Sequence, residues 1–138
     1  MLVLSKRIQF SAAHRLHNPA LSEDENRRLF GECNHPHGHG HNYEVEVMVE
    51  GRPDPVTGMV MNLRTLREIL EREVLARTHY KSLDEAGGLL DGRLSTTENL
   101  AIAIWDAVRP HVQPARLHLV RVKESENNVV EYTGPELA

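Results

Sequence analysis

Two histidines separated by one residue, His39 and His41, carry the strongest chemical signal in the sequence. In an extended strand, residues i and i+2 project to the same side, so both share the apolar face of Tyr43 and Val45. The same alternation places His14 on the apolar face of an N-terminal strand. Zinc prefers imidazole nitrogens, and three protein ligands leave a fourth position for water or substrate. The sequence therefore predicts a catalytic zinc at these three histidines; the alternative is that His39 and His41 belong to a surface turn.

The single cysteine, Cys33, lies in the same glycine- and histidine-rich stretch. A lone cysteine cannot form an internal disulfide, so the chain is not a disulfide-stapled secreted scaffold. The thiol can be buried and inert, a fourth zinc ligand, or a reactive thiolate. Five other histidines are interpreted as solvated, surface or ordinary strand positions: His17, His35, His37, His111 and His118. The alternative for His35 and His37 is an adventitious metal ligand.

Four strands are needed to position these residues, and alternating apolar residues predict them. The even positions of residues 2–16 are apolar apart from Lys6 and His14, and the odd positions of residues 39–50 are apolar after His39 and His41. Two further strands are predicted over residues 117–124 and 129–133. The pair Asn127-Asn128 between them favours a tight hairpin.

Helix signals separate the two pairs of strands. Ser22 with Glu25 forms a capping box for a short helix that Gly31 ends. Asn62 caps a helix with an apolar stripe, and a second capping box at residues 95–98 opens another helix that Pro110 ends. The stripes of these two helices are Leu63, Leu66, Leu70 and Val74, then Leu100, Ile104 and Val108. This order predicts one α+β domain over residues 1–138, with two helices on one face of a four-stranded antiparallel sheet.

Composition excludes several classes of protein. The 138 residues carry a net charge of −4 with acidic and basic residues interleaved, which argues against nucleic acid as a partner. The N-terminal apolar run is too short for a signal peptide, and no stretch is long enough for a membrane span. We expect a cytoplasmic protein with no membrane partner.

Several motifs in sequence order resemble the 6-pyruvoyltetrahydropterin synthase family and its 6-carboxytetrahydropterin synthase relatives. They span nearly the whole chain without large insertions, and agreement of many motifs is more specific than any one. The matching segments read FSAAHRL at 10–16, FGECN at 30–34, GHGHNY at 38–43, DP at 54–55, GMVMNL at 58–63, STTEN at 95–99 and ESENN at 124–128.

The resemblance implies a tunnelling fold (T-fold) in which trimers close their sheets into a barrel. Two trimers would stack as a homohexamer, with sites shared between chains. It implies zinc on His14, His39 and His41, and a small-molecule pterin substrate, 7,8-dihydroneopterin triphosphate. The expected product is 6-pyruvoyltetrahydropterin, the route to tetrahydrobiopterin; the alternative is 6-carboxytetrahydropterin, which serves deazapurine (queuosine) biosynthesis.

The resemblance also assigns roles to other residues. Cys33 matches the family's general base, and Glu124 matches the glutamate that anchors the pterin ring. Thr96 and Thr97 match residues lining the same pocket, and Glu98 accompanies them. Without the resemblance, Glu124 would be an ordinary strand-end glutamate and the threonines part of a helix cap.

One departure from the family pattern concerns the Asp-His pair that assists the cysteine. Ungapped counting places His79 and Tyr80 at these two positions, so the aspartate is missing. An imidazole from His79, or the phenol of Tyr80, would then act as the proton shuttle. The altered pair also leaves open a pterin-binding homologue with little activity, and a third alternative is a histidine-rich metal buffer.

Overall fold

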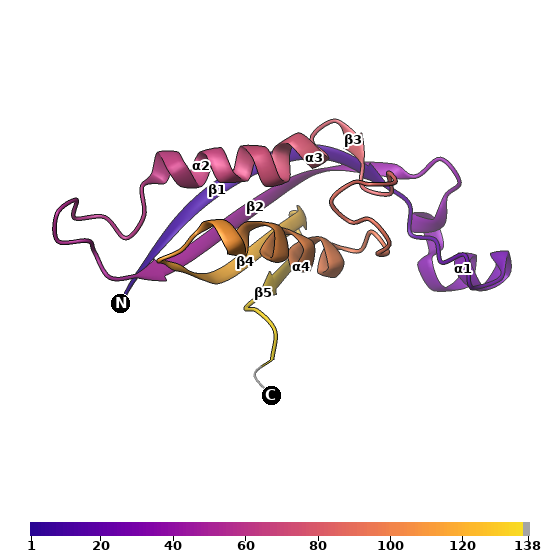
Figure 1. Ribbon diagram of the computed structural model, residues 1–138. Helices are drawn as coiled ribbons and strands as arrows, with labels where there is room; N and C mark the ends of the chain where they lie inside the picture. Colours follow the sequence, from indigo (N-terminus) through magenta and orange to yellow (C-terminus); the bar gives the residue numbers. More distant parts are fainter. Residues whose placement is uncertain (137–138) are drawn as a thin grey trace.

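The computed structural model describes residues 1–136 and contains one mixed five-stranded sheet (Figure 1). The spatial order is β3-β1-β2-β4-β5. The strands are β1 (Leu2–His14), β2 (His39–Gly51), β3 (Lys81–Ser82), β4 (Arg116–Ser125) and β5 (Asn128–Tyr132). The predicted four-stranded antiparallel sheet was incomplete, because the two-residue β3 pairs in parallel with the end of β1. A strand this short has no alternating pattern from which it could be recognised.

The central pair of strands, β1 and β2, is antiparallel over its whole length. Its register runs from Leu2 opposite Gly51 to His14 opposite His39. One face is apolar and buried, with Phe10 stacked on Tyr43. The other face carries charged pairs such as Arg7 with Glu44. This division explains why alternation was a reliable signal for both strands.

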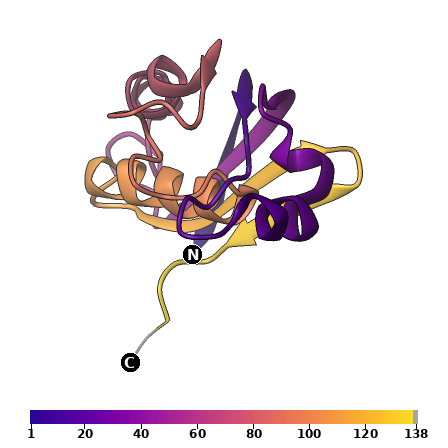
Figure 2. The same cartoon turned by 90° about the vertical axis from the view of Figure 1, so that its right-hand side faces the viewer.

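Two helical segments cover the apolar face of the sheet (Figures 1 and 2). The first is continuous: α2 (Leu63–Leu70), a π-helical turn η2 (Glu71–Leu75) and α3 (Ala76–Thr78). The second is α4 (Thr97–Val108), followed by the 3₁₀ turn η3 (Arg109–His111). Their stripe residues share one core with β2, including Leu66, Leu100 and Val47. The prediction of two helices on one face is confirmed.

A third helix, α1 (Glu23–Phe30), lies beyond the ends of β1 and β2 (Figure 1). Ser22 forms the predicted capping box with Glu25, and the 3₁₀ turn η1 (Gly31–Asn34) follows directly. Gly31 has φ of 55° and ends the helix as predicted. Residues 15–38 thus form an excursion from the sheet that carries Cys33.

The N-terminal cap of α2 is the predicted residue, whereas that of α4 is shifted by one residue. Asn62 caps α2 as predicted, accepting a hydrogen bond from the amide of Arg64. The predicted capping box beginning at Ser95 was wrong by one residue, because Thr96 is the N-cap of α4 and accepts from the amide of Asn99. Ser95 is buried beside the histidines. No helix within residues 1–136 is long and apolar enough to cross a membrane.

Candidate active site

The three histidines predicted as metal ligands meet at one end of the sheet. His14 of β1 lies directly opposite His39 of β2, and His41 follows two residues along the same face. The Nε2 atoms of His14 and His39 are 3.2 Å apart. One ligand atom from each of the three rings lies within 4.8 Å of the others. Tetrahedral zinc with Zn–N bonds of about 2.0–2.1 Å needs nitrogens roughly 3.4 Å apart, so the cluster fits a small metal ion.

Two further observations favour a metal at this cluster. The Nδ1 of His14 lies 2.7 Å from the carbonyl oxygen of Ser95. A carbonyl only accepts, so Nδ1 carries the proton and Nε2 presents a lone pair toward His39, as a metal ligand requires. The Nε2 of His41 is buried and has no hydrogen-bond partner among the described residues. A buried unpartnered nitrogen is costly unless something binds it.

The electrostatics of His41 also suit a ligand. Burial lowers the pKa of His41 below its usual value, and the neighbouring His14 and His39 lower it further, while Glu124 opposes them. Neutral imidazole is the form that binds metal. The Glu124 carboxylate lies 3.8 Å from Nε2 of His41, beyond hydrogen-bond distance. It therefore sits beside the cluster without taking up the free nitrogen.

Glu124 is held by the helix that faces it. The hydroxyl of Thr97 donates a short hydrogen bond to one carboxylate oxygen of Glu124. Both line a cavity of about 370 Å³ together with Glu98. Three of the four predicted substrate-binding residues are thus brought together. Thr96, the fourth, uses its side chain to cap α4.

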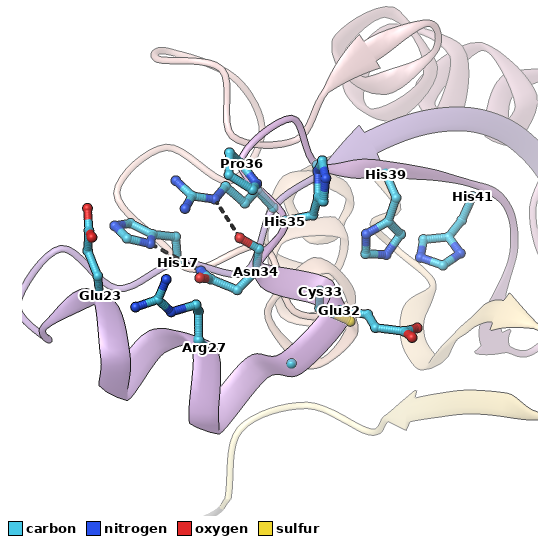
Figure 3. A pocket seen from close by; sticks show the side chains of 13 residues that line it. His17, Glu23, Arg27, Glu32, Cys33, Asn34, His35, Pro36, His39 and His41 are labelled. Carbon is cyan, nitrogen blue, oxygen red and sulfur yellow. Dashed lines mark hydrogen bonds between the residues drawn. The ribbon is translucent and has the colours of Figure 1, made fainter.

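Cys33 lies on the other side of the histidines, in a cavity of about 970 Å³ (Figure 3). The thiol is half-buried on η1. The backbone carbonyl oxygen of Cys33 accepts a hydrogen bond of 2.8 Å from the amide of Leu16, just after β1. The cavity is lined by His39, His41, Cys33 and residues of the excursion: Arg15, His17, Glu23, Arg27, Gly31, Glu32, Asn34, His35, Pro36 and Gly38.

Two residues that were not among the predicted site residues hold the segment around Cys33 in place. Asn34 is buried, and its amide donates to the carbonyl of Leu16 at 2.7 Å. Gly38 has φ of 69°, and a Cβ there would lie 2.7 Å from the carbonyl oxygen of His14. Glycine is therefore required where the chain turns back into β2. Ser95, whose carbonyl orients His14, was likewise considered only as a helix cap. The sequence around Ser95 indicates only a helix cap, because the contact of its carbonyl with His14 depends on the tertiary structure.

His79 and Tyr80 lie beside β1, close to His41 but outside the Cys33 cavity. The Nδ1 of His79 accepts a 3.1 Å hydrogen bond from the amide of Ser11 on β1. Tyr80 has φ of 60°, is 83% exposed, and lines a cavity of about 470 Å³ together with Ser11, Asn42 and His41. Within the described residues, neither side chain lines the cavity that contains Cys33. Their catalytic role stays a prediction.

The peripheral histidines behave largely as expected. His35 and His37 are exposed, as predicted. His111 lies 3.2 Å from Glu73, and His118 lies 3.3 Å from Glu50. His17 is half-buried and lines the Cys33 cavity, so describing it as an ordinary surface or strand position was incomplete.

Comparison with known proteins identifies the family. Residues 3–135 match the family model described as 6-pyruvoyl tetrahydropterin synthase. The chain is 47% identical over 131 residues to the 6-pyruvoyl tetrahydrobiopterin synthase of Homo sapiens, covering 95% of this chain and 90% of that protein. It is 46% identical over 133 residues to the Drosophila melanogaster protein of the same name, covering 96% of this chain and 79% of that one.

Solved structures agree with the sequence comparisons. The Caenorhabditis elegans 6-pyruvoyl tetrahydropterin synthase superposes with a TM-score of 0.90 at 36% identity, covering 97% of this chain and 96% of that chain. The Plasmodium vivax enzyme, at 16% identity and a TM-score of 0.62, covers 96% of this chain and 98% of that chain and shares the fold. The tunnelling fold expected from the motifs is thus the fold of these neighbours. The chain belongs to the 6-pyruvoyl tetrahydropterin synthase family.

Proposed function

We propose that this chain is a zinc-dependent lyase that converts 7,8-dihydroneopterin triphosphate to 6-pyruvoyltetrahydropterin with loss of triphosphate, acting as one domain. The observation that carries the proposal is that a carboxylate, the histidine cluster and a thiol lie next to one another. A threonine-held carboxylate, Glu124, lies 3.8 Å from His41 of the histidine cluster. His41 in turn lines the cavity that contains the Cys33 thiol. Names of the family members given above support the substrate class.

The histidine cluster is the metal site of this proposal. His14, His39 and His41 would hold zinc, with the Ser95 carbonyl keeping His14 in the required tautomer. Bound zinc supplies a Lewis acid that polarises a substrate hydroxyl and stabilises negative charge nearby. This chemistry requires no redox cofactor.

The protein's own side chains bind the ring and move the proton. Glu124 accepts hydrogen bonds from the amino group and adjacent N–H of the pterin, and a carboxylate does so with two parallel bonds. The hydroxyl of Thr97 fixes the rotamer of Glu124. Glu98 lines the same cavity, with Thr96 capping the helix that carries it. Cys33, as the thiolate, removes a proton from the side-chain carbon.

The proton shuttle is proposed to involve a neighbouring copy. Tyr80 is exposed and does not line its own Cys33 cavity, so its phenol is free to reach another chain. His79 lies beside it, with ring centroids 3.8 Å apart, and its Nδ1 is already engaged by Ser11. Its Nε2 is the nitrogen available for proton transfer. We propose that this pair replaces the Asp-His pair of the family.

The proposed assembly is a homohexamer built from two trimers. The sheet is open, with β3 and β5 at its edges, and β3 pairs with β1 only at Ala12 and Ala13. Apolar side chains are exposed along these strands, including Leu2, Val3 and Val129. Closing three sheets into a barrel would pair the free edges and cover these side chains. Light scattering at micromolar concentration tests this, and a monomer would contradict it.

Product analysis tests the reaction. Zinc-loaded protein is incubated with 7,8-dihydroneopterin triphosphate, and pterin product and released triphosphate are measured by mass spectrometry and ion chromatography. We expect 6-pyruvoyltetrahydropterin and triphosphate in equal amounts. Formation of 6-carboxytetrahydropterin instead would show the alternative reaction of the family. Absence of turnover with retained pterin binding would show a binding homologue.

A further inference from the structure

The Cys33 cavity extends past the thiol, away from the histidines, into a region rich in basic side chains (Figure 3). Four of its lining residues carry cationic or imidazole donors: Arg15, His17, Arg27 and His35. We name this group the cationic lobe. The whole cavity of about 970 Å³ lies at the upper end of the range of about 300–1,000 Å³ found for small-molecule pockets. In the proposed function, the pterin ring lies at Glu124 and the reacting side chain of the substrate lies at Cys33. The lobe is then left to bind another part of the substrate.

Arg15 is held in place but keeps donors free. Its amide donates to Asp84 at 2.6 Å, and its carbonyl accepts from the Ser95 hydroxyl at 3.3 Å. Its Nε donates to the carbonyl of Asn34 at 3.1 Å, and its guanidinium forms no ion pair with the described residues. An anchored guanidinium without a carboxylate partner has its two terminal nitrogens available for an anion.

The two histidines of the lobe also present donors. The Asn34 amide nitrogen donates to the carbonyl of Leu16 and lies 3.1 Å from Nδ1 of His17. That nitrogen has no lone pair to offer, so Nδ1 of His17 accepts and Nε2 carries the proton. Nδ1 of His35 accepts from the backbone amide of His37 at 3.3 Å, which gives His35 the same tautomer. Both rings therefore offer an N–H from Nε2.

Neither arginine of the lobe is paired with a buried carboxylate among the described residues. Arg27 pairs with Asp24 on α1, but the two side chains are 67% and 89% exposed, and such pairs contribute little. Glu32 also lines the cavity, and its carboxylate points toward the histidine pair and away from Arg27 (Figure 3). Glu23 lines the far end and forms no ion pair with the described residues.

We propose that the cationic lobe binds the polyphosphate chain of the substrate, with Arg15 and Arg27 as the principal contacts. This assignment rests on the proposed function, in which the ring lies at Glu124 and the reacting side chain lies beside Cys33. The phosphate-bearing end must then leave past Cys33, where the lobe begins. Guanidinium groups match phosphate oxygens with parallel hydrogen bonds and stay charged at every accessible pH. The lobe makes the protein select a phosphorylated pterin over the free diol.

Binding of inorganic tripolyphosphate tests the lobe without turnover. Calorimetry with the full-length zinc-loaded protein should detect binding that weakens with salt. Arg15→Gln and Arg27→Gln should each lower the affinity on the order of tenfold, the scale of a lost charged hydrogen bond. Arg67→Gln is the matched control, because Arg67 of α2 pairs with Glu71 of η2, outside the cavity. Should Arg15→Gln fail to fold, Arg27→Gln and Arg15→Lys carry the same test.

Two further ligands, 7,8-dihydroneopterin and ATP, distinguish a site for the pterin triphosphate from a site for nucleotides. In the zinc-loaded Cys33→Ala protein, 7,8-dihydroneopterin should bind the Arg15 variant and its parent equally, because it has no phosphates. ATP should bind more weakly than the pterin triphosphate and should also depend on Arg15. ATP binding as tightly as the pterin triphosphate would make the lobe a nucleotide site and overturn the proposal.

These experiments distinguish a failure of the proposed polyphosphate site from a failure of the proposed reaction. Equal tripolyphosphate affinity in wild type, Arg15→Gln and Arg27→Gln, or no binding at all, would overturn the lobe even if the enzyme turns over its substrate. Arginine-dependent binding without any turnover would support a polyphosphate lobe and refute the proposed reaction. Arginine-dependent binding with normal wild-type turnover supports both.

Discussion

The two walls of the candidate site are built in different ways. The histidine wall stands on β1 and β2, which pair residue by residue over 13 positions each. The Cys33 wall stands on the excursion of residues 15–38, tied to the end of β1 by a few hydrogen bonds through Leu16 and Asn34. A paired strand fixes the direction of every side chain, whereas an excursion depends on single contacts. Metal geometry and the position of the base should therefore respond differently to mutation.

The largest effect is expected at the histidine wall. His39→Ala removes one of three imidazoles, and two ligands cannot hold zinc tightly. Metal content, measured by mass spectrometry of gently purified protein, should fall from about one ion per chain to under about a tenth of that. His118→Ala is the control, because that ring lies at Glu50, away from the cluster. Full zinc in His39→Ala would refute the metal site.

The thiol should separate catalysis from metal binding. Cys33→Ala should abolish turnover while leaving zinc and pterin binding nearly intact, since the thiol is a base and not a ligand in the proposed scheme. Cys33→Ser should be equally inactive, because a hydroxyl of similar size does not ionise near neutral pH. Loss of zinc along with activity would make Cys33 a fourth ligand and the scheme wrong.

The proton shuttle is expected to show an intermediate effect. His79→Ala should lower kcat on the order of a hundredfold or more, the usual scale for a positioned acid–base group. Tyr80→Phe, which keeps the ring, should matter less. The pH–rate profile of each variant separates a shuttle from a merely structural residue. Wild-type turnover in His79→Ala with an inactive Tyr80→Phe would assign the shuttle to the tyrosine.

Loosening the excursion should affect the base more than the metal. Asn34→Ala leaves the carbonyl of Leu16 without its donor, which costs about 1–3 kcal/mol in the free energy of unfolding. Turnover should fall as Cys33 loses its fixed position, with zinc content unchanged. Asn34→Asp is a matched variant, because it keeps the shape but cannot donate to the Leu16 carbonyl. Unchanged stability in both variants would show that the amide does not hold this wall.

The smallest effect is expected in a turn outside both walls. Asp54 accepts hydrogen bonds from the amides of Thr57 and Val56, which lower its pKa below the usual value of 3.8. A lowered folded-state pKa means that the carboxylate contributes stability above its ordinary pKa and loses it as pH falls through the folded value. The difference in unfolding free energy between wild type and Asp54→Asn, measured with urea, should therefore be small at neutral pH and vanish in acid. A difference that grows on acidification would contradict this sign.

Alternation in the sequence was enough to predict the long strands and the meeting of His14, His39 and His41 at one end of the sheet. The side-chain period of a strand is two, so the residues that share Tyr43's face follow directly from position. Burying one face of each strand fixes the register only to within steps of two residues, so the pairing of His14 with His39 was decided by the fold. Caps at Ser22 and Asn62 were equally local and equally predictable.

Tertiary structure decided what depends on contacts between distant segments. The parallel strand β3, the Ser95 carbonyl on His14 and the Asn34 amide on Leu16 join residues far apart in the chain. Sequence periodicity does not predict such contacts, because each consists of one or a few hydrogen bonds set by how helices and loops pack on the sheet. The same holds for the cationic lobe, whose members reach one cavity only because the excursion folds back beside β2. Local pattern determined which histidines share one face of the sheet, and packing determined what surrounds them.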